Sequence, residues 1–589
     1  MPRLWLKKIK AALCPAPNLV KRTFSLGRRR PFRTHTPEEA DRGPPKTRAD
    51  QPAGPPGRIT GEELEQERIG NRLDANLQRF RGLFNVPRSS DVVVREFRIG
   101  SSPAIRAGMI FIDGLVARDQ LTGTVLQPLM LLSKLGRPLP RRGRLKVVAE
   151  KLLPHHQLRQ HEVLADLVDA ILAGNTVLLI DGVAQGLVVE ARGHAHRAVE
   201  QTTSETVVRG PKHSFTENLR VNTALVRRLI RCPSLVIESW TLGRLTRTEV
   251  VLMYIEGLTN PWLVEETRRR ISTVDVDRLL DAGMLERMIE SPSQPTPFPV
   301  VPTMLATERP DRTAAFLADG YLAILVGDSP HALIAPTTFQ SFLHNPEDYY
   351  LNWPLGTALR LVRLIGTFTS LLLPAAYLSL INYHHALIPT ELVLAIAAAR
   401  ERVPFPSLVE IIGLEVGFEL IREAGIRIPS VIGPTIGIVG AVILGQAAVA
   451  ANLASPLLVI IVALTALGSF AIPNYSAAML LRTYRFFFIA LAAIAGFFGI
   501  AVGIYLIALM LCATKSFGVP FLSPVAPFRG GSPDVVLHGA QFLLHQRPRF
   551  LRPLDLVAQR RLIRSWDPVT AQLEEESGRP EHRPPCSTK

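Results

Sequence analysis

Residues Ile428 to Leu481 read IPSVIGPTIGIVGAVILGQAAVAANLASPLLVIIVALTALGSFAIPNYSAAMLL, an uninterrupted run without a charged side chain. As one helix, rising 1.5 Å per residue, it would be about 81 Å long, against a bilayer core of about 30 Å. The chain must therefore turn back, and Asn452–Pro456 is the predicted turn. Two more uncharged runs, Leu364–Thr390 and Phe486–Thr514, flank it. Three such runs predict an integral membrane protein.

The average composition, 47% hydrophobic and 20% charged, is that of an ordinary soluble protein. It conceals two unlike halves, because residues 1–355 carry most of the charge and residues 360–515 most of the apolar surface. The predicted fold class is an α/β soluble N-terminal region of two subdomains, followed by an all-α polytopic membrane domain.

Residues 1–60, rich in Pro, Gly and Arg, are predicted to form a disordered basic tail. Residues 1–37 contain ten Lys or Arg and no acid, which fits a solvated tail, a contact with anionic lipid headgroups or a nucleic-acid arm. The membrane half favours lipid over nucleic acid. Pro15 and Pro17 interrupt the apolar stretch Ala11–Val20, so it is not a signal peptide.

The soluble region is predicted to hold one α/β subdomain at 61–205 and a second at 206–350. Periodicity and turn residues define the elements of each. In the first they are a helix at Glu62–Phe84, strands at Val92–Val94 and Met109–Ile112, a helix at Leu121–Leu135 and a hairpin of Val177–Ile180 with Leu187–Val189. In the second they are strands at Leu235–Ile237 and Val250–Ile255, a helix from Trp262, a helix at Asp275–Ile289 and a hairpin of Tyr321–Val326 with His331–Ala335.

The membrane domain, residues 360–515, is predicted to contain four to five spans, and a polar tail follows at 516–589. The apolar segments are Leu364–Ile381, bent at Pro374, then Ser407–Arg422, Ile432–Ala450, Leu457–Ile472 and Phe486–Leu511. Three arginine pairs should all face the cytoplasm: Arg360 with Arg363, Arg422 with Arg427, and Arg482 with Arg485.

The topology stays open at this stage. If Leu387–Ile421 crosses the bilayer, all three arginine pairs lie inside but the tail lies outside. If that segment is re-entrant, the tail lies inside and two pairs lie on the opposite face. Residues 516–589 contain ten Lys or Arg, which favours a cytoplasmic tail.

Three acids interrupt an otherwise apolar helix, at Glu410, Glu415 and Glu419, and Arg422 follows Glu419 by three residues. Ionisable groups at membrane depth are costly and usually face a bundle interior or a water-filled path. They therefore predict an ion path or gate, or else an interfacial helix whose acids lie among headgroups. Close helix packing is predicted at glycines four residues apart: Gly413 and Gly417, Gly433 and Gly437, and Gly499 and Gly503.

Enzyme motifs are absent from the sequence, which has no phosphate-binding loop, dinucleotide fingerprint, nucleophile elbow or HExxH. Its four cysteines are scattered, with no CxxC pair, and His194, His196 and His213 lack supporting ligands. We therefore expect no catalytic residues, no cofactor and no metal.

Long collinear stretches between about residues 90 and 528 resemble the A subunit of the GerA-type spore germinant receptors and the related stage V sporulation protein AF. The most specific are VVRGPKHSFTENLRVNTA (Val207–Ala224), YIEGLTNPWLVEETRRR (Tyr254–Arg270), TERPDRTA (Thr307–Ala314), NPEDYY (Asn345–Tyr350), IPTELVLAIAAARERVPFP (Ile388–Pro406), EAGIRIP (Glu423–Pro429), GAVILGQAA (Gly440–Ala448) and SFGVPFLSPVAP (Ser516–Pro527). Residues 1–60 and those after 530 lie outside the resemblance.

The resemblance implies a membrane subunit that transduces germinant binding into ion release during germination, and an oligomeric ion channel is one form that this activity could take. It further implies a transporter-like B subunit and a lipoprotein C subunit as partners, a homo-oligomer in contact with lipid, and no nucleic acid. The implied location is the spore inner membrane, with the soluble region on the cytoplasmic, or core, side. Alternatives are a sporulation protein of the AF type that assists ion or dipicolinate release, a secondary transporter acting alone, and a membrane-anchored scaffold.

Overall fold

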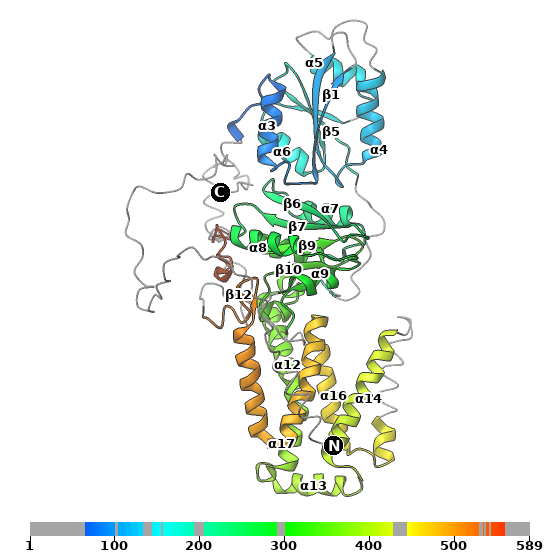
Figure 1. Ribbon diagram of the computed structural model, residues 1–589, viewed down its shortest axis with the longest axis vertical. Helices are drawn as coiled ribbons and strands as arrows, with labels where there is room; N and C mark the ends of the chain where they lie inside the picture. The colour runs from blue at the N-terminus through cyan, green and yellow to red at the C-terminus, as the bar shows by residue number, and fades with distance from the viewer. Residues whose placement is uncertain are drawn as a thin grey trace, which may run out of the picture. The chain divides into compact units, whose positions relative to one another are not determined.

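The computed structural model describes residues 65–99, 104–132, 144–154, 157–193, 205, 207–290, 301–427, 445–528, 534, 537–540 and 544–559. The predicted basic tail and the end of the chain lie outside these residues. Two five-stranded sheets precede a helical region (Figure 1). The predicted fold class is confirmed, and every strand pair in both sheets is antiparallel.

The first sheet has the strand order β1-β2-β4-β5-β3 and is covered on both faces. Its strands are β1 (Val92–Ile99), β2 (Ile105–Ile112), β3 (Leu158–His161), β4 (Thr176–Ile180) and β5 (Gly186–Val189). Alternate residues point to opposite faces. Ile110 packs with helices α3 (Leu73–Leu83) and α6 (Leu164–Leu172). Met109 packs with the helical turns α4 (Arg118–Leu121), η2 (Thr122–Leu126), η3 (Pro128–Leu132), α5 (Arg144–Val147) and η4 (Val148–Leu152).

The second sheet repeats this plan, with the order β6-β7-β9-β10-β8. Its strands are β6 (Leu235–Leu242), β7 (Thr248–Ile255), β8 (Leu305–Thr307), β9 (Leu322–Val326) and β10 (Ala332–Ala335). One face is covered by α7 (Leu219–Leu229) and α10 (Pro310–Ala318), and the other by α8 (Pro261–Ser272) and α9 (Ala282–Ile289). Both sheets therefore follow the same sequence of helix, two strands, helices, strand, helix and two strands.

Both predicted hairpins form, as β4 with β5 and as β9 with β10. The helix predicted from Trp262 begins at Pro261, where the Asn260 side chain accepts a hydrogen bond from the Trp262 N–H at 3.0 Å. The helix predicted at Asp275–Ile289 begins only at Ala282, because Asp281 caps it. The helix predicted at Glu62–Phe84 becomes regular only at Leu73, since residue 69 instead hydrogen-bonds to the backbone of residue 162.

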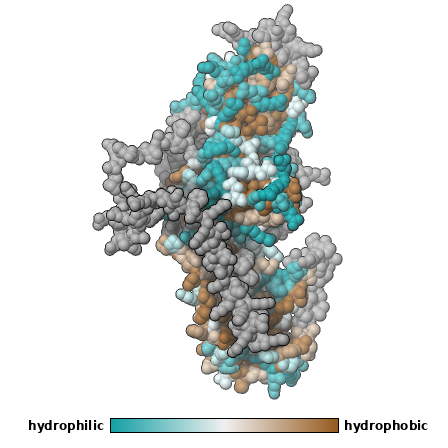
Figure 2. Space-filling view, viewed as in Figure 1, coloured by the Kyte–Doolittle hydropathy of each residue, from teal (hydrophilic) through white to brown (hydrophobic). Residues whose placement is uncertain are grey.

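The helical region contains α12 (Trp353–Asn382), α13 (Thr390–Arg400), α14 (Ser407–Arg427), α16 (Pro456–Phe470) and α17 (Tyr475–Ala513). Within the described residues, α12 and α17 are long and apolar enough to cross a membrane. Figure 2 shows hydrophobic residues on the surface of this region, whereas the sheets expose mainly hydrophilic ones. Most of the predicted span Ile432–Ala450 lies outside the described residues, so the number of spans stays a prediction.

Helix α17 reverses direction at Gly496, whose φ of 60° and ψ of −140° are not helical. A Cβ placed on Gly503 would lie 2.8 Å from the Phe488 ring, and the Tyr484 hydroxyl lies 3.7 Å from the Met510 sulfur. In a straight helix, residues 488 and 503 would be about 22 Å apart. The prediction of one span at Phe486–Leu511 is therefore wrong, because two antiparallel arms meet at Gly496 (Figure 1).

This reversal offers a topology that avoids the conflict between the arginine pairs and the tail. Ala477 and Leu480, near the start of α17, and Met510 and Leu511, near its end, all pack against the core of the second sheet. The chain therefore enters and leaves α17 on the side of the soluble region. If both arms cross the bilayer, the reversal adds one crossing to those predicted from the sequence. The arginine pairs and the start of the C-terminal tail can then share one side, as the distribution of basic residues favours.

We expect Gly496→Ala to lower the stability of the full chain by about 1–3 kcal/mol, because only glycine adopts this backbone conformation without strain. The added Cβ would also lie 3.1 Å from Tyr383 and His384. Thermal unfolding of the detergent-solubilised protein measures the effect. Gly413→Ala is the matched control, since a Cβ there meets nothing within 4 Å. Equal midpoints for both variants would show that the reversal does not require glycine.

Candidate functional site

Charged side chains gather where the soluble region meets α12. The short helix α11 (Glu347–Tyr350) stands directly before α12, and each of its side chains contacts a different segment. The Glu347 carboxylate accepts hydrogen bonds from the backbone N–H groups of residues 208 and 209, both at 3.2 Å. Tyr350 donates to Asp311 on α10 at 2.6 Å, and Tyr349 donates to Asp534 of the C-terminal segment at 2.5 Å.

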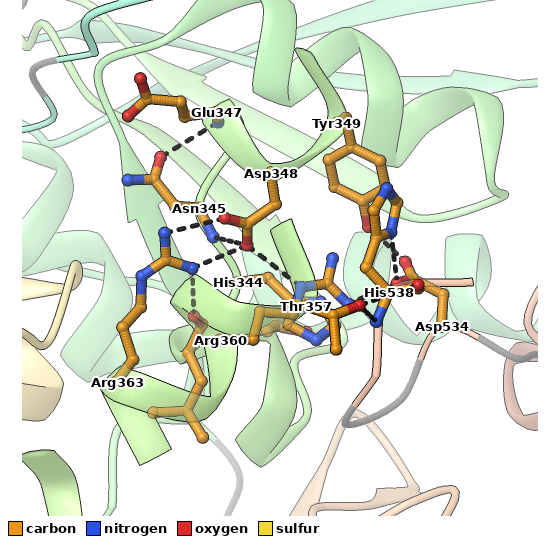
Figure 3. Close-up of polar contacts among 12 residues, drawn as sticks. His344, Asn345, Glu347, Asp348, Tyr349, Thr357, Arg360, Arg363, Asp534 and His538 are labelled. Atoms are coloured by element: carbon orange, nitrogen blue, oxygen red, sulfur yellow. Dashed lines mark hydrogen bonds and ion pairs between the residues drawn. The ribbon is translucent and has the colours of Figure 1, made fainter. Parts of the chain in front are cut away.

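Asp348 faces the membrane helix and lies at the centre of this contact (Figure 3). It is 0% exposed, and both of its carboxylate oxygens bind the Arg363 guanidinium, at 2.7 and 2.8 Å. The Arg360 Nε donates to the same carboxylate at 3.1 Å. Arg360 and Arg363 are three residues apart on α12, so they share one face. Burial acts to raise the pKa of Asp348, but the two guanidiniums outweigh it and hold the pKa below its usual value.

The C-terminal segment closes the same cluster. Asp534 forms an ion pair with Arg360 and lies 3.1 Å from His538 Nδ1. The Thr357 hydroxyl on α12 donates to the His538 carbonyl at 3.1 Å. Despite burial, hydrogen bonds from His538 and the charges around Asp534 hold its pKa far below the usual value. We call Asp348, Arg360, Arg363 and Asp534 the junction cluster, in which two positive and two negative charges balance.

Helix α10 holds the loop that leads into α11. Arg312 donates from Nη2 to the carbonyls of Ser341, at 2.9 Å, and His344, at 3.0 Å. Its Nη1 binds Glu205 at 2.8 Å. Arg309 forms an ion pair with Asp311, the acid that accepts from Tyr350. A continuous chain of polar contacts thus leads from α10 of the second sheet through α11 to α12.

A separate buried ion pair joins the two sheets. Arg227 of α7 is 1% exposed, and its Nε donates at 2.7 Å to Asp91, which directly precedes β1. Its Nη2 donates to the other carboxylate oxygen of Asp91 and to the Ser89 hydroxyl, both at 3.1 Å. A change in the first sheet therefore has a physical route to the second.

The predicted acids of the membrane half have separate partners. Glu415 is 1% exposed and pairs with Arg485 on the first arm of α17, at 2.5 Å. Arg485 also donates from Nε to the Ser370 carbonyl at 2.7 Å. This pair therefore joins α14, α17 and α12. Because Arg485 lies far from Glu415 along the chain, no helical spacing in the sequence indicates the pair.

The other two acids serve different contacts. Glu410 accepts a hydrogen bond from the Ser455 backbone N–H, at 2.5 Å, beside the start of α16, and its second oxygen lies 3.9 Å from Arg400. Glu419 pairs with Arg422 on its own helix, as their spacing suggests. The structure does not bring the three acids together at one point, and their role in an ion path stays a prediction.

The glycine pairs differ in their surroundings. A Cβ on Gly413 would meet nothing within 4 Å, whereas Gly499 and Gly503 lie against the first arm of α17. Gly417 is half-buried on α14, and the pair at Gly433 and Gly437 lies outside the described residues. Helices α12 and α16 approach closely at two glycines that belong to none of the predicted pairs. A Cβ on Gly468 would lie 2.6 Å from the Gly366 carbonyl oxygen.

Metal ligands do not assemble among the described residues, where no three His, Cys, Asp or Glu side chains form a group that could hold an ion. Of the three histidines considered from the sequence, His194 and His196 lie outside these residues and His213 is exposed.

Several known proteins are similar to this chain along most of its length. The family described as Bacillus/Clostridium GerA spore germination protein matches residues 78–550. Spore germination protein KA of Bacillus subtilis (strain 168) is 37% identical over 475 residues, covering 80% of this chain and 86% of its own. The uncharacterized membrane protein YfkQ of the same organism is 35% identical over 498 residues, covering 83% and 93%.

A solved structure also matches part of the chain. The crystal structure of the N-terminal domain of the A subunit of the Bacillus megaterium spore germinant receptor GerK3 is 31% identical. The match covers 46% of this chain and 98% of that one, with a TM-score of 0.36.

We expect Asp348→Asn to destabilise the full chain by about 3–5 kcal/mol, the usual cost of removing one partner of a buried ion pair. The pKa of Asp348 is lowered in the folded state. Its stabilisation is therefore fully present above the unfolded pKa of about 3.9 and is lost as the pH falls through the folded pKa. Unfolding midpoints should differ most near pH 7 and converge in strong acid.

The matched control for Asp348→Asn is Asp275→Asn, which breaks an ion pair with Arg244 in which both side chains are 67% exposed. The control should leave the midpoint nearly unchanged, because solvent screens such pairs. A control as destabilising as Asp348→Asn would contradict the importance given to burial in the junction cluster.

Proposed function

Because this chain belongs to the family of Bacillus/Clostridium GerA spore germination proteins, we propose that it is the membrane subunit of a nutrient germinant receptor, in which it converts germinant binding into ion release. The names of several relatives indicate a role in spore germination, and none of these names denotes an enzyme. The finer assignment rests on the collinear stretches, such as Val207–Ala224 and Tyr254–Arg270, that resemble the A subunits of germinant receptors.

The observation that carries this proposal is the set of contacts made by α11. Tyr350 and Glu347 tie it to α10 and to the segment at 208–209, while Asp348 ties it to α12. Asp348 is fully buried and its bond to Arg363 is bidentate, so it does not readily exchange a guanidinium for water. A displacement of the second sheet would therefore move α12. Coupling between two sites typically amounts to about 1–3 kcal/mol, which a few such hydrogen bonds can supply.

The gate, in this proposal, is the contact between Glu415 and Arg485. It joins α14 to α17, and Arg485 also binds the Ser370 carbonyl of α12. A movement of α12 begun at the junction cluster would disturb this contact. We place the ion path beside these helices, in one copy or between copies of a homo-oligomer in the membrane.

Partners and location follow from the family in the same proposal. The receptor would contain a transporter-like B subunit that binds the germinant and a lipoprotein C subunit. It would lie in the spore inner membrane with the soluble region on the core side. The arginine pairs support this orientation, because Arg360 and Arg363 contact the junction beside the soluble region and basic residues favour the cytoplasmic side.

We expect Tyr350→Phe to slow nutrient-triggered ion release by about 5-fold or more, because it removes the bond to Asp311 and weakens the coupling. Release triggered without nutrient should be unchanged. Potassium and dipicolinate release from spores with normal amounts of the protein measures both. Tyr505→Phe, which alters a tyrosine that is 66% exposed, should respond like the natural chain.

Deletion of the gene is the companion experiment. Deletion spores should lose the response to at least one nutrient and keep the nutrient-independent response. A normal response to every nutrient would reject the receptor assignment, and it would leave the stage V sporulation type of protein or a scaffold as the explanation.

We expect Glu415→Gln to release ions without nutrient, because Arg485 would keep a buried charge without its partner and the helices would separate more readily. The double variant Glu415→Gln with Arg485→Gln removes both charges and should leak less. Glu423→Gln, at an exposed acid of the same helix, is the matched control. If Glu415→Gln accumulates normally and releases ions at the natural rate with and without nutrient, the pair is no gate.

A further inference from the structure

Buried guanidinium nitrogens without hydrogen-bond partners gather where α14 meets the first arm of α17. Arg482 is 7% exposed, its Nε is buried without a hydrogen-bond partner, and it forms no ion pair among the described residues. The Arg422 side chain is 8% exposed. Its Nη2 pairs with Glu419 on the same helix, whereas its Nε and Nη1 are buried without a hydrogen-bond partner. The Nη2 of Arg485 is also buried and unsatisfied.

The charges at this place do not balance. The charged side chains that act most strongly on Arg422 and Arg482 include Arg485, Glu415 and Glu419, and Arg422 acts on Arg482. Three positive and two negative charges leave one positive charge in excess. The run Ile428–Leu481, which follows α14, contains no acid that could balance it. Glu423, the next acid on α14, is exposed and has an interaction of its own.

An uncompensated charge in a buried site is costly, and proteins normally pair it or bind a counterion. The excess here lies near helix ends. Arg482 is at the start of the third turn of α17, and the neighbouring Ala477 and Leu480 pack against the core of the second sheet. Arg422 lies in the last two turns of α14. This places the cluster toward the soluble side of the membrane region, at the level where lipid headgroups would lie.

We propose that Arg422 and Arg482, together with Nη2 of Arg485, form a binding site for a phosphate group. Guanidinium groups bind phosphate through paired N–H donors and lose less hydration than an ammonium, so they suit a partly buried site. A singly charged phosphodiester of an anionic lipid matches the excess charge. Free phosphate has the same chemistry and is the second source. The site does not involve the germinant, and it shares Arg485 with the proposed gate.

The test uses the purified full chain in a phosphate-free zwitterionic detergent, with thermal unfolding as the readout. Phosphatidylglycerol, phosphatidylcholine and inorganic phosphate are titrated separately. We expect phosphatidylglycerol or inorganic phosphate to raise the unfolding midpoint, and phosphatidylcholine to have a weaker effect. Stabilisation by phosphatidylglycerol alone assigns the site to a lipid headgroup. Stabilisation by inorganic phosphate assigns it to the free anion.

Arg482→Gln should raise the half-maximal concentration of the stabilising ligand by about 10-fold or more, as expected for a lost charge-assisted contact. Without ligand it should unfold no earlier than the natural chain, since it removes an unpaired charge. Arg482→Lys keeps the charge but not the paired donors and should be intermediate. Arg402→Gln, at an exposed arginine between α13 and α14, is the matched control.

The proposal is overturned if neither ligand stabilises the natural chain more than phosphatidylcholine does. It is also overturned if Arg482→Gln and Arg402→Gln respond to the ligand equally. Should Arg482→Gln fail to fold, Arg482→Lys decides, because an unchanged half-maximal concentration in that variant would exclude a bidentate phosphate contact.

Discussion

The buried contact between Asp348 and the guanidiniums of Arg360 and Arg363 holds the membrane half to the soluble region. A fully buried carboxylate must be paired, since leaving it alone in a low-dielectric site costs several kcal/mol. The pairing fixes the start of α12 against α11, and Asp534 fixes the C-terminal segment by binding the same Arg360. Both sheets have the same strand order, and among the described residues the contacts to α11 come from the second, through α10. The first sheet reaches this point through the second, by way of the pair that Arg227 forms with Asp91.

The charged side chains of the membrane half fall into two groups with different roles. Glu415 and Arg485 neutralise each other, and their ion pair holds α14 against α17. Arg422, Arg482 and Arg485 outnumber Glu415 and Glu419, and in our proposal the excess charge binds a phosphate group from outside the chain. The reversal at Gly496 makes both arrangements possible, because it returns the end of α17 to the soluble side and allows its first arm to pack between neighbouring helices.

Elements that depend on neighbouring residues could be predicted from the sequence alone. The absence of charge from Ile428 to Leu481 indicated a membrane half, alternation indicated the hairpins of β4 with β5 and of β9 with β10, and Asn260-Pro261 indicated the start of α8. The family, too, was recognisable from collinear stretches. These signals lie within a few residues of one another, so periodicity and turn chemistry suffice to detect them.

Which charges meet, and where α17 turns, became visible only in three dimensions. Glu415 and Arg485 lie on different helices far apart in the sequence, and Asp348 and Asp534 meet through Arg360, so no local spacing relates them. Arg360 and Arg363 suggested only an orientation in the membrane, although they form the junction cluster. A glycine in an apolar helix is usually a packing residue. At Gly496 the backbone reverses, and the Tyr383 hydroxyl lies 2.5 Å from the Ala493 carbonyl and 3.1 Å from the Ile494 carbonyl beside the turn.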